Sequence, residues 1–460
     1  MVGVQRTSAR CHLHFGRGAF RCDILSVRGR VLGPLAAGLL VAGWTAGAEA
    51  GDATYGPPAP EAGGDQVALA DPPGIDETLA RAAEATLATF PSLEAARNNL
   101  RAAGFEIDAA RWLRFPRVTA SIETRDDQLD VRPDILVFQP LWSGGRISAA
   151  GERSRAAQVV ANATFEEVSF SLLERLALAY YEIGRTARLV AVFEESVAEH
   201  RRLVESMERR VEQEVSPRTD LELALTRTAQ TEQELALLRT QLGIAQRRFS
   251  ELSGMDTANL PLPVYDPAEH HAVSDQLAAD AGACNPTVKR LNALVSLAEA
   301  DRKISKAQIM PELGVQYVRD RFQGDQVGLA VRAQTNGGLS ALSLAEAAAA
   351  RRDASQFDAL TAQRELRESV ALALIENSNS KARIESSARS ADSSLNVTRS
   401  FLRQFVAGRR TWLDVMNSVR EAVTARAALI EAETSAMSSS ARIHLRACAW
   451  LPTSPVETAP

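Results

Sequence analysis

The sequence predicts a mainly α-helical protein with a small β part and an internal structural duplication. Alanine and leucine dominate the 460 residues and aromatic residues make up only 5%, a composition typical of helices with small side chains at their contacts. Two very long segments contain almost no helix breakers, whereas four short segments alternate apolar and polar residues. The landmarks of the first half recur about 195 residues later. Together these observations favour two similar halves of long helices and short strands.

The duplication is indicated by landmarks that keep nearly the same spacing. They are Pro116 and Pro311, Gly144-Gly145 and Gly337-Gly338, and Asp220 and Asp414. Such a period is too long for a solenoid repeat and indicates a duplicated domain half. We therefore expect a signal peptide, a flexible arm, two repeats and a tail. Their predicted ranges are 1–50, 51–74, 75–265, 266–450 and 451–460.

The start of the chain has the pattern of a secretory signal. The apolar segment Val31–Trp44 follows Arg28 and Arg30, and Ala48-Glu49-Ala50 provides a small-x-small cleavage site. This pattern is typical of export across the inner membrane. The segment after it, up to Gly74, is rich in Pro, Gly and Ala and predicts the flexible arm.

Each repeat is expected to run helix, two strands, very long helix, turn, helix. A first helix follows Phe90-Pro91 and Asn285-Pro286. The strands are expected at 118–124, 133–142, 313–318 and 327–333, from their period-2 alternation or β-rich composition. The helices after them are expected at 146–215, 219–252, 339–407 and 410–450.

The long helices are the most informative elements. The segment 339–407 contains neither Gly nor Pro, and at ~1.5 Å rise per residue it would extend about 100 Å. The shorter helix at 219–252 carries a heptad seam, which predicts left-handed supercoiling against a neighbour. The seam consists of Leu235, Leu238, Leu242, Ala245, Phe249 and Leu252. Polar residues on the opposite faces predict walls that are half solvated.

The net charge and the absence of known motifs argue against several classes of protein function. The net charge of −5 offers no basic excess for phosphates, so nucleic-acid binding is not expected. No apolar run reaches ~18 residues, so hydropathy predicts no transmembrane helix. No catalytic triad, Walker motif, glycine-rich phosphate loop or Cys-His arrangement occurs in a supporting context. We therefore expect no enzymatic activity and no cofactor. A metal at His270-His271 is the weaker alternative, because adjacent side chains point apart.

The motifs that mark the repeat also resemble a family. They are Phe90-Pro91-Ser92, Phe115-Pro116, Gln139–Arg146 and Gly408–Asp414. In order and duplication they are similar to the outer-membrane efflux protein family, typified by TolC, over about residues 75–450. The resemblance implies a homotrimer in which each protomer gives four strands to an outer-membrane β-barrel. The long helices would form a hollow periplasmic α-barrel with an equatorial belt.

The resemblance also implies a function as a passive exit duct without chemistry of its own. Its partners would be outer-membrane lipid, a periplasmic adaptor protein and an inner-membrane ABC transporter or proton-driven pump. The segments Arg409–Asn417 and Arg420-Glu421 are similar to the branch that exports large adhesins by type I secretion. Efflux of small molecules (a drug or a metal) is the alternative within transport. A periplasmic coiled-coil structural protein is the alternative from another class.

The resemblance further implies a periplasmic gate at the two helix-turn-helix tips. Its residues would be Thr219, Asp220, Phe405 and Arg410, with Arg410 pairing with Asp220 or Thr219 of a neighbouring coil. An Arg–Asp pair suits a lock because it is directional and breakable. The family often has a tyrosine in this network, whereas Phe405 has no hydroxyl. Glu214 also stands where the first tip usually has a glycine.

Asp414 would form a three-fold selectivity ring at the entrance, and Asn417 replaces the second acidic ring of some relatives. The alternative is that Asp414 and Arg410 are ordinary solvated charges, with Asp414 capping its own helix.

Other assignments stay open at this stage. Gly144, Gly145, Gly337 and Gly338 mark the junctions between barrel and helices. Trp142 and Phe138 form either an interfacial aromatic girdle or simple sheet packing. Cys284 and Cys448 fall near the equatorial belt of this fold, where a disulfide is one alternative and two free thiols are the favoured one.

Overall fold

The computed structural model describes residues 74–121, 134–267, 281–320, 324–333 and 340–451. The chain divides into two units, residues 1–62 and 63–460, and every described residue belongs to the second. The predicted signal peptide, the arm before Gly74 and the pair His270-His271 lie outside the described residues. The predicted domain boundaries therefore stay predictions.

The order helix, two strands, long helix, helix occurs twice, as predicted. The first half contains α1 (Glu77–Thr89), α2 (Pro91–Trp112), β1 (Arg117–Ser121), β2 (Asp134–Trp142), α3 (Arg146–Glu212) and α4 (Arg218–Ser253). The second half contains α6 (Pro286–Ala307), β3 (Glu312–Asp320), β4 (Gly324–Arg332), α7 (Ser340–Val406) and α8 (Trp412–Arg446). The described residues confirm a mainly α fold with a small β part. Helix α1 precedes the first predicted helix.

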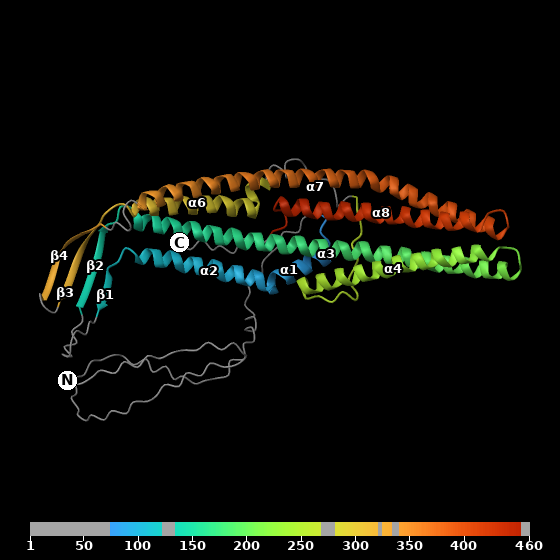
Figure 1. Cartoon of the computed structure of the whole chain (residues 1–460), viewed down its shortest axis with the longest axis horizontal. Helices are drawn as coiled ribbons and strands as arrows, with labels where there is room; N and C mark the ends of the chain where they lie inside the picture. Colours follow the sequence, from blue (N-terminus) through green and yellow to red (C-terminus); the bar gives the residue numbers. More distant parts are fainter. Residues whose placement is uncertain (1–73, 122–133, 268–280, 321–323, 334–339, 452–460) are drawn as a thin grey trace, which may run out of the picture. The chain divides into compact units, whose positions relative to one another are not determined.

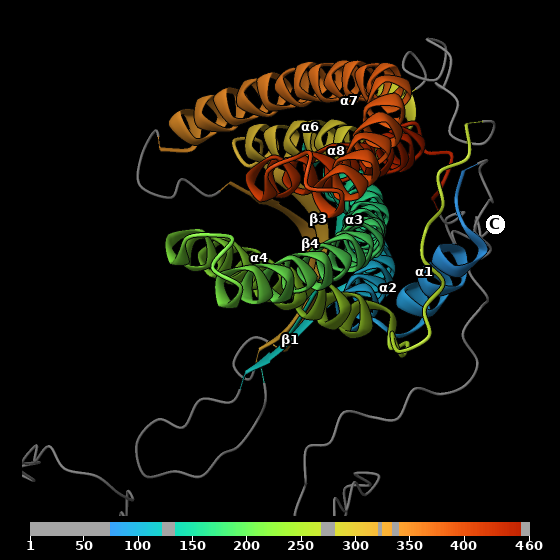
Figure 2. The same ribbon diagram turned by 90° about the vertical axis from the view of Figure 1, so that its right-hand side faces the viewer.

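The two long helices dominate the described part of the chain (Figure 1). Helices α3 and α7 have 67 residues each, which corresponds to about 100 Å. Helix α3 contacts α4 and α6, while α7 contacts α6 and α8, so the two repeats lie alongside each other. Figure 2, which faces the helix ends, shows α3 and α4 as one pair and α7 and α8 as another. None of the described helices combines the length and apolar character needed to cross a membrane.

The heptad seam of α4 packs against α3. Leu235, Ala245, Phe249 and Leu252 are buried, and Leu238 and Leu242 are partly buried in the same clusters. Because these positions step by three and four residues, they stay on one side of the helix over about five turns. The predicted coiled-coil pairing is therefore confirmed.

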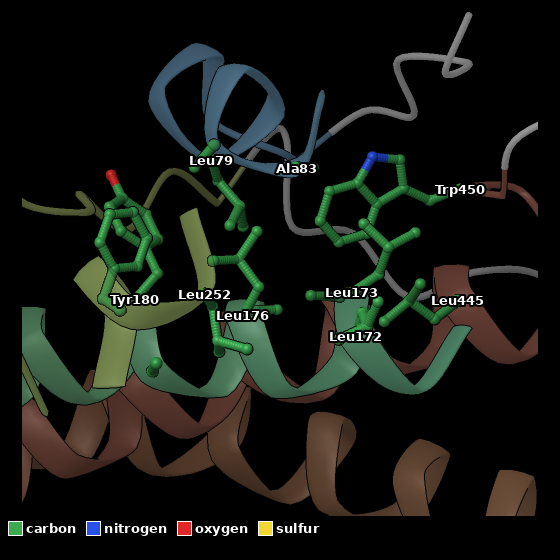
Figure 3. Packing of buried hydrophobic residues seen from close by; sticks show 14 of the residues in the cluster. Leu79, Ala83, Leu172, Leu173, Leu176, Tyr180, Leu252, Leu445 and Trp450 are labelled. Carbon is green, nitrogen blue, oxygen red and sulfur yellow. The ribbon is translucent and has the colours of Figure 1, made fainter. Parts of the chain in front are cut away.

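The largest core lies where α1, α2 and the end of α8 meet the middle of α3 (Figure 3). Leu79 of α1, Leu173 and Leu176 of α3, and Trp450 after α8 are fully buried there. Each buried leucine contributes about 1.5–3 kcal/mol relative to exposure. This cluster fixes both ends of the described chain to the long helix.

A buried tyrosine is the polar part of this core. The Tyr180 hydroxyl lies 3.0 Å from Asp76 Oδ2 and 3.1 Å from the carbonyl oxygen of Pro261. Burial, and then the charge of Asp76, raise the pKa of Tyr180 above its ordinary value. The hydroxyl therefore stays protonated and links the segments before α1 and after α4 to α3.

The four strands form one antiparallel sheet in the order β1-β2-β3-β4. The central pairing of β2 with β3 joins the two halves, with Val137 opposite Tyr317. A register shift between Pro140 and Trp142 interrupts this pairing, as expected where proline cannot donate a ladder hydrogen bond. Strands that are 180 residues apart in sequence thus depend on each other.

The favoured expectation of two free thiols is wrong. Cys284 and Cys448 form a disulfide with a Cα–Cα distance of 6.1 Å. Cys284 lies two residues before α6 and Cys448 two residues after α8. The bond therefore ties the start of the second repeat to its end, closing a separation of 164 residues.

Candidate functional site

The two helix-turn-helix tips have the same backbone geometry. The Val215 N–H donates to the Arg210 carbonyl oxygen at 2.9 Å, and the Arg409 N–H donates to the Gln404 carbonyl oxygen at 2.8 Å. Both pairs span five residues, as in a Schellman motif. The residue before each donor is left-handed, because φ is 59° at Glu214 and 70° at Gly408. Glu214 therefore takes the place that Gly408 occupies 194 residues later.

The acidic residues of the tips are equivalent as well. Asp220 lies in the first turn of α4 and Asp414 in the first turn of α8, where the positive end of the helix dipole favours a carboxylate. The Thr411 side chain accepts the Asp414 backbone N–H at 3.2 Å. Thr411 is therefore the N-cap of α8, and the Asp414 carboxylate is not needed for that task.

Arg410 contacts three groups of its own tip. Its Nη1 lies 3.7 Å from Asp414 Oδ2, its Nε donates to Gln404 Oε1 at 3.2 Å, and its guanidinium stacks 4.2 Å from the centre of the Phe401 ring. The Arg410 and Asp414 side chains are each 41% exposed. The predicted pairing with Asp220 or Thr219 would join neighbouring protomers, so it stays a prediction, as does the Asp414 ring.

Phe405 lies in the core of the tips. It is 5% exposed, and the Arg210 guanidinium covers its ring at 5.2 Å. Phe405 is on α7 and the other buried members come from α3, α4 and α8, so the two tips of one protomer pack together. They are Leu203, Val204, Met207, Ala224, Trp412, Val415, Met416 and Val419. Sequence reasoning did not single out Met207 or Val419, although their helical spacing was the available signal.

Glycines are required where the sheet passes into α3. Gly144 has φ of 60° and Gly145 has φ of 89°, a region that disfavours other residues. A Cβ on Gly144 would also lie 2.4 Å from the Met310 Cβ atom. The first predicted glycine pair thus permits both the turn and the close packing. Gly337 and Gly338 lie outside the described residues.

An ion-pair cluster holds the same junction. Glu312 Oε1 accepts hydrogen bonds from Arg117 and Arg146, each at 2.9 Å. One carboxylate therefore connects β1, β3 and the first turn of α3. Phe138 beside it is 1% exposed, with the Arg332 guanidinium 3.9 Å from its ring centre, which supports sheet packing. Trp142 is 50% exposed and stays a candidate for an aromatic girdle.

The described residues contain no group of three or more potential metal ligands of the His, Cys, Asp and Glu types. The candidate site has two parts, one at each end of the long helices. It has two tips with matched carboxylates at one end of the long helices, and an arginine-rich junction to the sheet at the other.

Comparisons with known proteins agree with this geometry. Residues 82–255 match the family described as outer membrane efflux protein. The solved outer-membrane channel OprN is 18% identical with a TM-score of 0.70, and the match covers 81% of this chain and 90% of that one. VceC from Vibrio cholerae is 17% identical with a TM-score of 0.68, and the match covers 81% of this chain and 96% of VceC. CmeC from Campylobacter jejuni is 10% identical with a TM-score of 0.71, and the match covers 83% of this chain and 88% of CmeC. A search of curated proteins finds no match.

The chain therefore has the fold of outer-membrane channel subunits. The match of residues 82–255 to the family described as outer membrane efflux protein agrees with this fold. Proteins of this family are transport ducts and not enzymes.

Proposed function

We propose that this protein is the outer-membrane exit duct of a tripartite export system, assembled as a homotrimer. The observation that carries the proposal is the sheet. One face exposes apolar side chains, with Val118 68%, Val327 74%, Leu329 76% and Val331 70% exposed. Such an apolar patch marks a surface that contacts a partner or a membrane.

The open edges of the sheet favour the membrane and the trimer. Strands β1 and β4 are the edges, and in lipid every backbone N–H and C=O needs a partner. Pairing of β4 with β1 of the next copy would close the edges, and three protomers would give about twelve strands. The helical part would then extend into the periplasm. A purely periplasmic coiled-coil protein would leave the apolar face of the sheet in water.

We assign the duct to type I secretion of a large protein or adhesin, with a periplasmic adaptor and an inner-membrane ABC transporter. The tip segment Arg409–Asn417 supports this assignment by its similarity to that branch. Small-molecule efflux with a proton-driven pump is the second candidate. It is favoured by the description of the family that matches residues 82–255.

Topology and assembly can be tested together. Because Cys284 and Cys448 are paired and Cys11 and Cys22 lie in the predicted signal peptide, the mature protein should offer no free thiol to compete with an introduced cysteine. Cysteines within residues 125–132 should react with membrane-impermeant reagents on intact cells. The control Ser216→Cys at the first tip should react only after the outer membrane is opened. The opposite pattern, or a stable folded monomer in sedimentation of the detergent extract, would refute the proposal.

Cargo is tested in a deletion strain. Loss of a large protein from the medium or cell surface, with unchanged drug sensitivity, would support type I secretion. Increased drug or metal sensitivity with unchanged secretion would favour the second candidate.

A further inference from the structure

The face of the sheet opposite the apolar side chains carries an arginine cluster. The register places Arg117 opposite Phe138 and Phe138 opposite Gln316, whereas Val118 is opposite Val137 on the apolar face. Side chains of adjacent strand residues point to opposite faces. If lipid covers the apolar face, this second face lines the interior of the duct.

Three guanidiniums meet on the inner face near its junction with α3. Arg117 and Arg146 share the carboxylate of Glu312. Arg332 donates to the neutral amide oxygen Gln316 Oε1 at 2.9 Å. We call Arg117, Arg146 and Arg332 the arginine collar.

The collar holds its arginines by packing as much as by charge. The Phe138 ring lies 5.5 Å from the Arg117 guanidinium and 3.9 Å from that of Arg332. Cation–π stacking orients both groups without neutralising them. Gly314 leaves room for this ring, since a Cβ there would lie 2.5 Å from the Phe138 Cζ atom. Glycine thus permits an aromatic ring to hold two arginines in place.

The collar is electropositive and keeps donors available. Among the residues that the structure describes, the carboxylate that pairs with these three guanidiniums is that of Glu312, bound by Arg117 and Arg146, whereas Arg332 binds an amide oxygen. Each guanidinium has five N–H donors, and the described hydrogen bonds use one from each. The Arg117 and Arg146 side chains are 49% and 35% exposed. Planar donor forks of this kind match carboxylate and phosphate oxygens.

We propose that the arginine collar is a binding site for anionic groups of the cargo, carboxylates or phosphates, inside the duct where the sheet meets the helices. The proposal rests on the proposed channel function, because only a closed trimer turns this face into a lumen. Three-fold symmetry would bring three collars around one axis. The collar would then favour anions at the end of the duct opposite the acidic tips.

The test uses the full-length trimer in planar bilayers. Two anionic probes, inorganic tripolyphosphate and tetraglutamate, are added separately, and the concentration that halves the conductance is measured. The variants Arg332→Gln and Arg117→Gln should each raise this concentration about tenfold, the effect of losing a charge-assisted hydrogen bond of about 1.4 kcal/mol. They should also shift the reversal potential toward cation preference.

Two control variants separate charge from packing. Arg332→Lys keeps the cation without the planar fork and should retain more of the block by the probes than Arg332→Gln does. Arg319→Gln removes an arginine that pairs with Asp325 at 2.8 Å and belongs to the register of the apolar face, so block should be unchanged.

Each outcome decides a different point. Block by one probe alone would support the site and identify the preferred oxygen group. Equal block of wild type, Arg332→Gln and Arg117→Gln would overturn the collar and leave the channel function intact. Equal loss in Arg332→Lys and Arg332→Gln would assign Arg332 to packing and also overturn it. If the wild type forms no channel, the proposed function fails and the collar with it.

Discussion

Replacing Glu214 by glycine should stabilise the turn between α3 and α4. Glu214 has φ of 59° in a tip whose counterpart carries Gly408 with φ of 70°. The left-handed conformation costs a non-glycine residue roughly 1–2 kcal/mol. The Glu214 side chain is exposed, so its removal sacrifices little packing.

The expected gain is smaller than the full backbone cost. Glycine has more conformational freedom in the unfolded chain, which opposes the change by about 0.4–1 kcal/mol. The net stabilisation of the tip should therefore be about 1 kcal/mol, or roughly a fivefold change in the local opening equilibrium.

Amide hydrogen exchange by mass spectrometry measures that opening. The Val215 and Ser216 N–H groups both donate to the Arg210 carbonyl oxygen, at 2.9 and 3.3 Å. In the detergent-solubilised protein, peptides over residues 208–218 should exchange about fivefold more slowly in Glu214→Gly. Peptides over the second tip serve as an internal reference and should not change.

Gly408→Ala is the matched control at the equivalent position. It places a Cβ in the left-handed region, so exchange of the Arg409 amide should accelerate to a similar degree. If Glu214→Gly leaves exchange at the first tip unchanged or faster while Gly408→Ala behaves as expected, the backbone conformation of Glu214 is not costly and the reasoning fails.

Three further predictions concern the gate, the entrance charge and the disulfide. Arg410→Ser should raise single-channel conductance in planar bilayers. Loss of an exposed ion pair destabilises the closed gate by only ~0.2–1 kcal/mol per copy, but the trimer loses three copies. Unchanged conductance in both Arg410→Ser and Asp220→Ala would contradict the lock. Asp414→Ala should reduce cation preference and block by multivalent cations, whereas an unaltered reversal potential would remove Asp414 from the selectivity ring. Cys284→Ser should lower the free energy of unfolding by about 2–5 kcal/mol if the bond acts mainly on the unfolded chain. In denaturing gel electrophoresis the wild type should migrate faster without reductant than with it. Equal migration would argue against a bond to Cys448.

Much of the fold could be predicted because periodicity determines it locally. The breaker-free segment after Leu339 predicted α7 to within a residue at each end, and alternation or β-rich composition predicted the four strands. The sequence prediction lacks helix α1, because the proline of Phe90-Pro91 indicates the start of a helix and not the end of a preceding one. Pro91 occupies the first position of α2, and α1 ends at Thr89.

The interactions across the chain could not be predicted in the same way. The disulfide depends on the 6.1 Å between two Cα atoms that are 164 residues apart, a distance that no local pattern encodes. The partners of Arg410 depend on the turn, which brings Gln404 and Phe401 back beside it. The sequence shows Glu214 where a glycine is usual, but only the backbone structure reveals that Glu214 has a positive φ.

The equal spacing of the two tips has a consequence for symmetry in the proposed trimer. Two repeats per protomer would place six nearly equivalent tips around the axis of the trimer. An ancestor with a single repeat could have built the same ring from six identical copies. In such a hexamer any substitution would appear six times. After duplication, Ser216 and Arg410 occupy equivalent places 194 residues apart and differ in charge. At this position the ring would therefore alternate an arginine with a serine, so that the guanidinium donor of one tip could face an acceptor on the next.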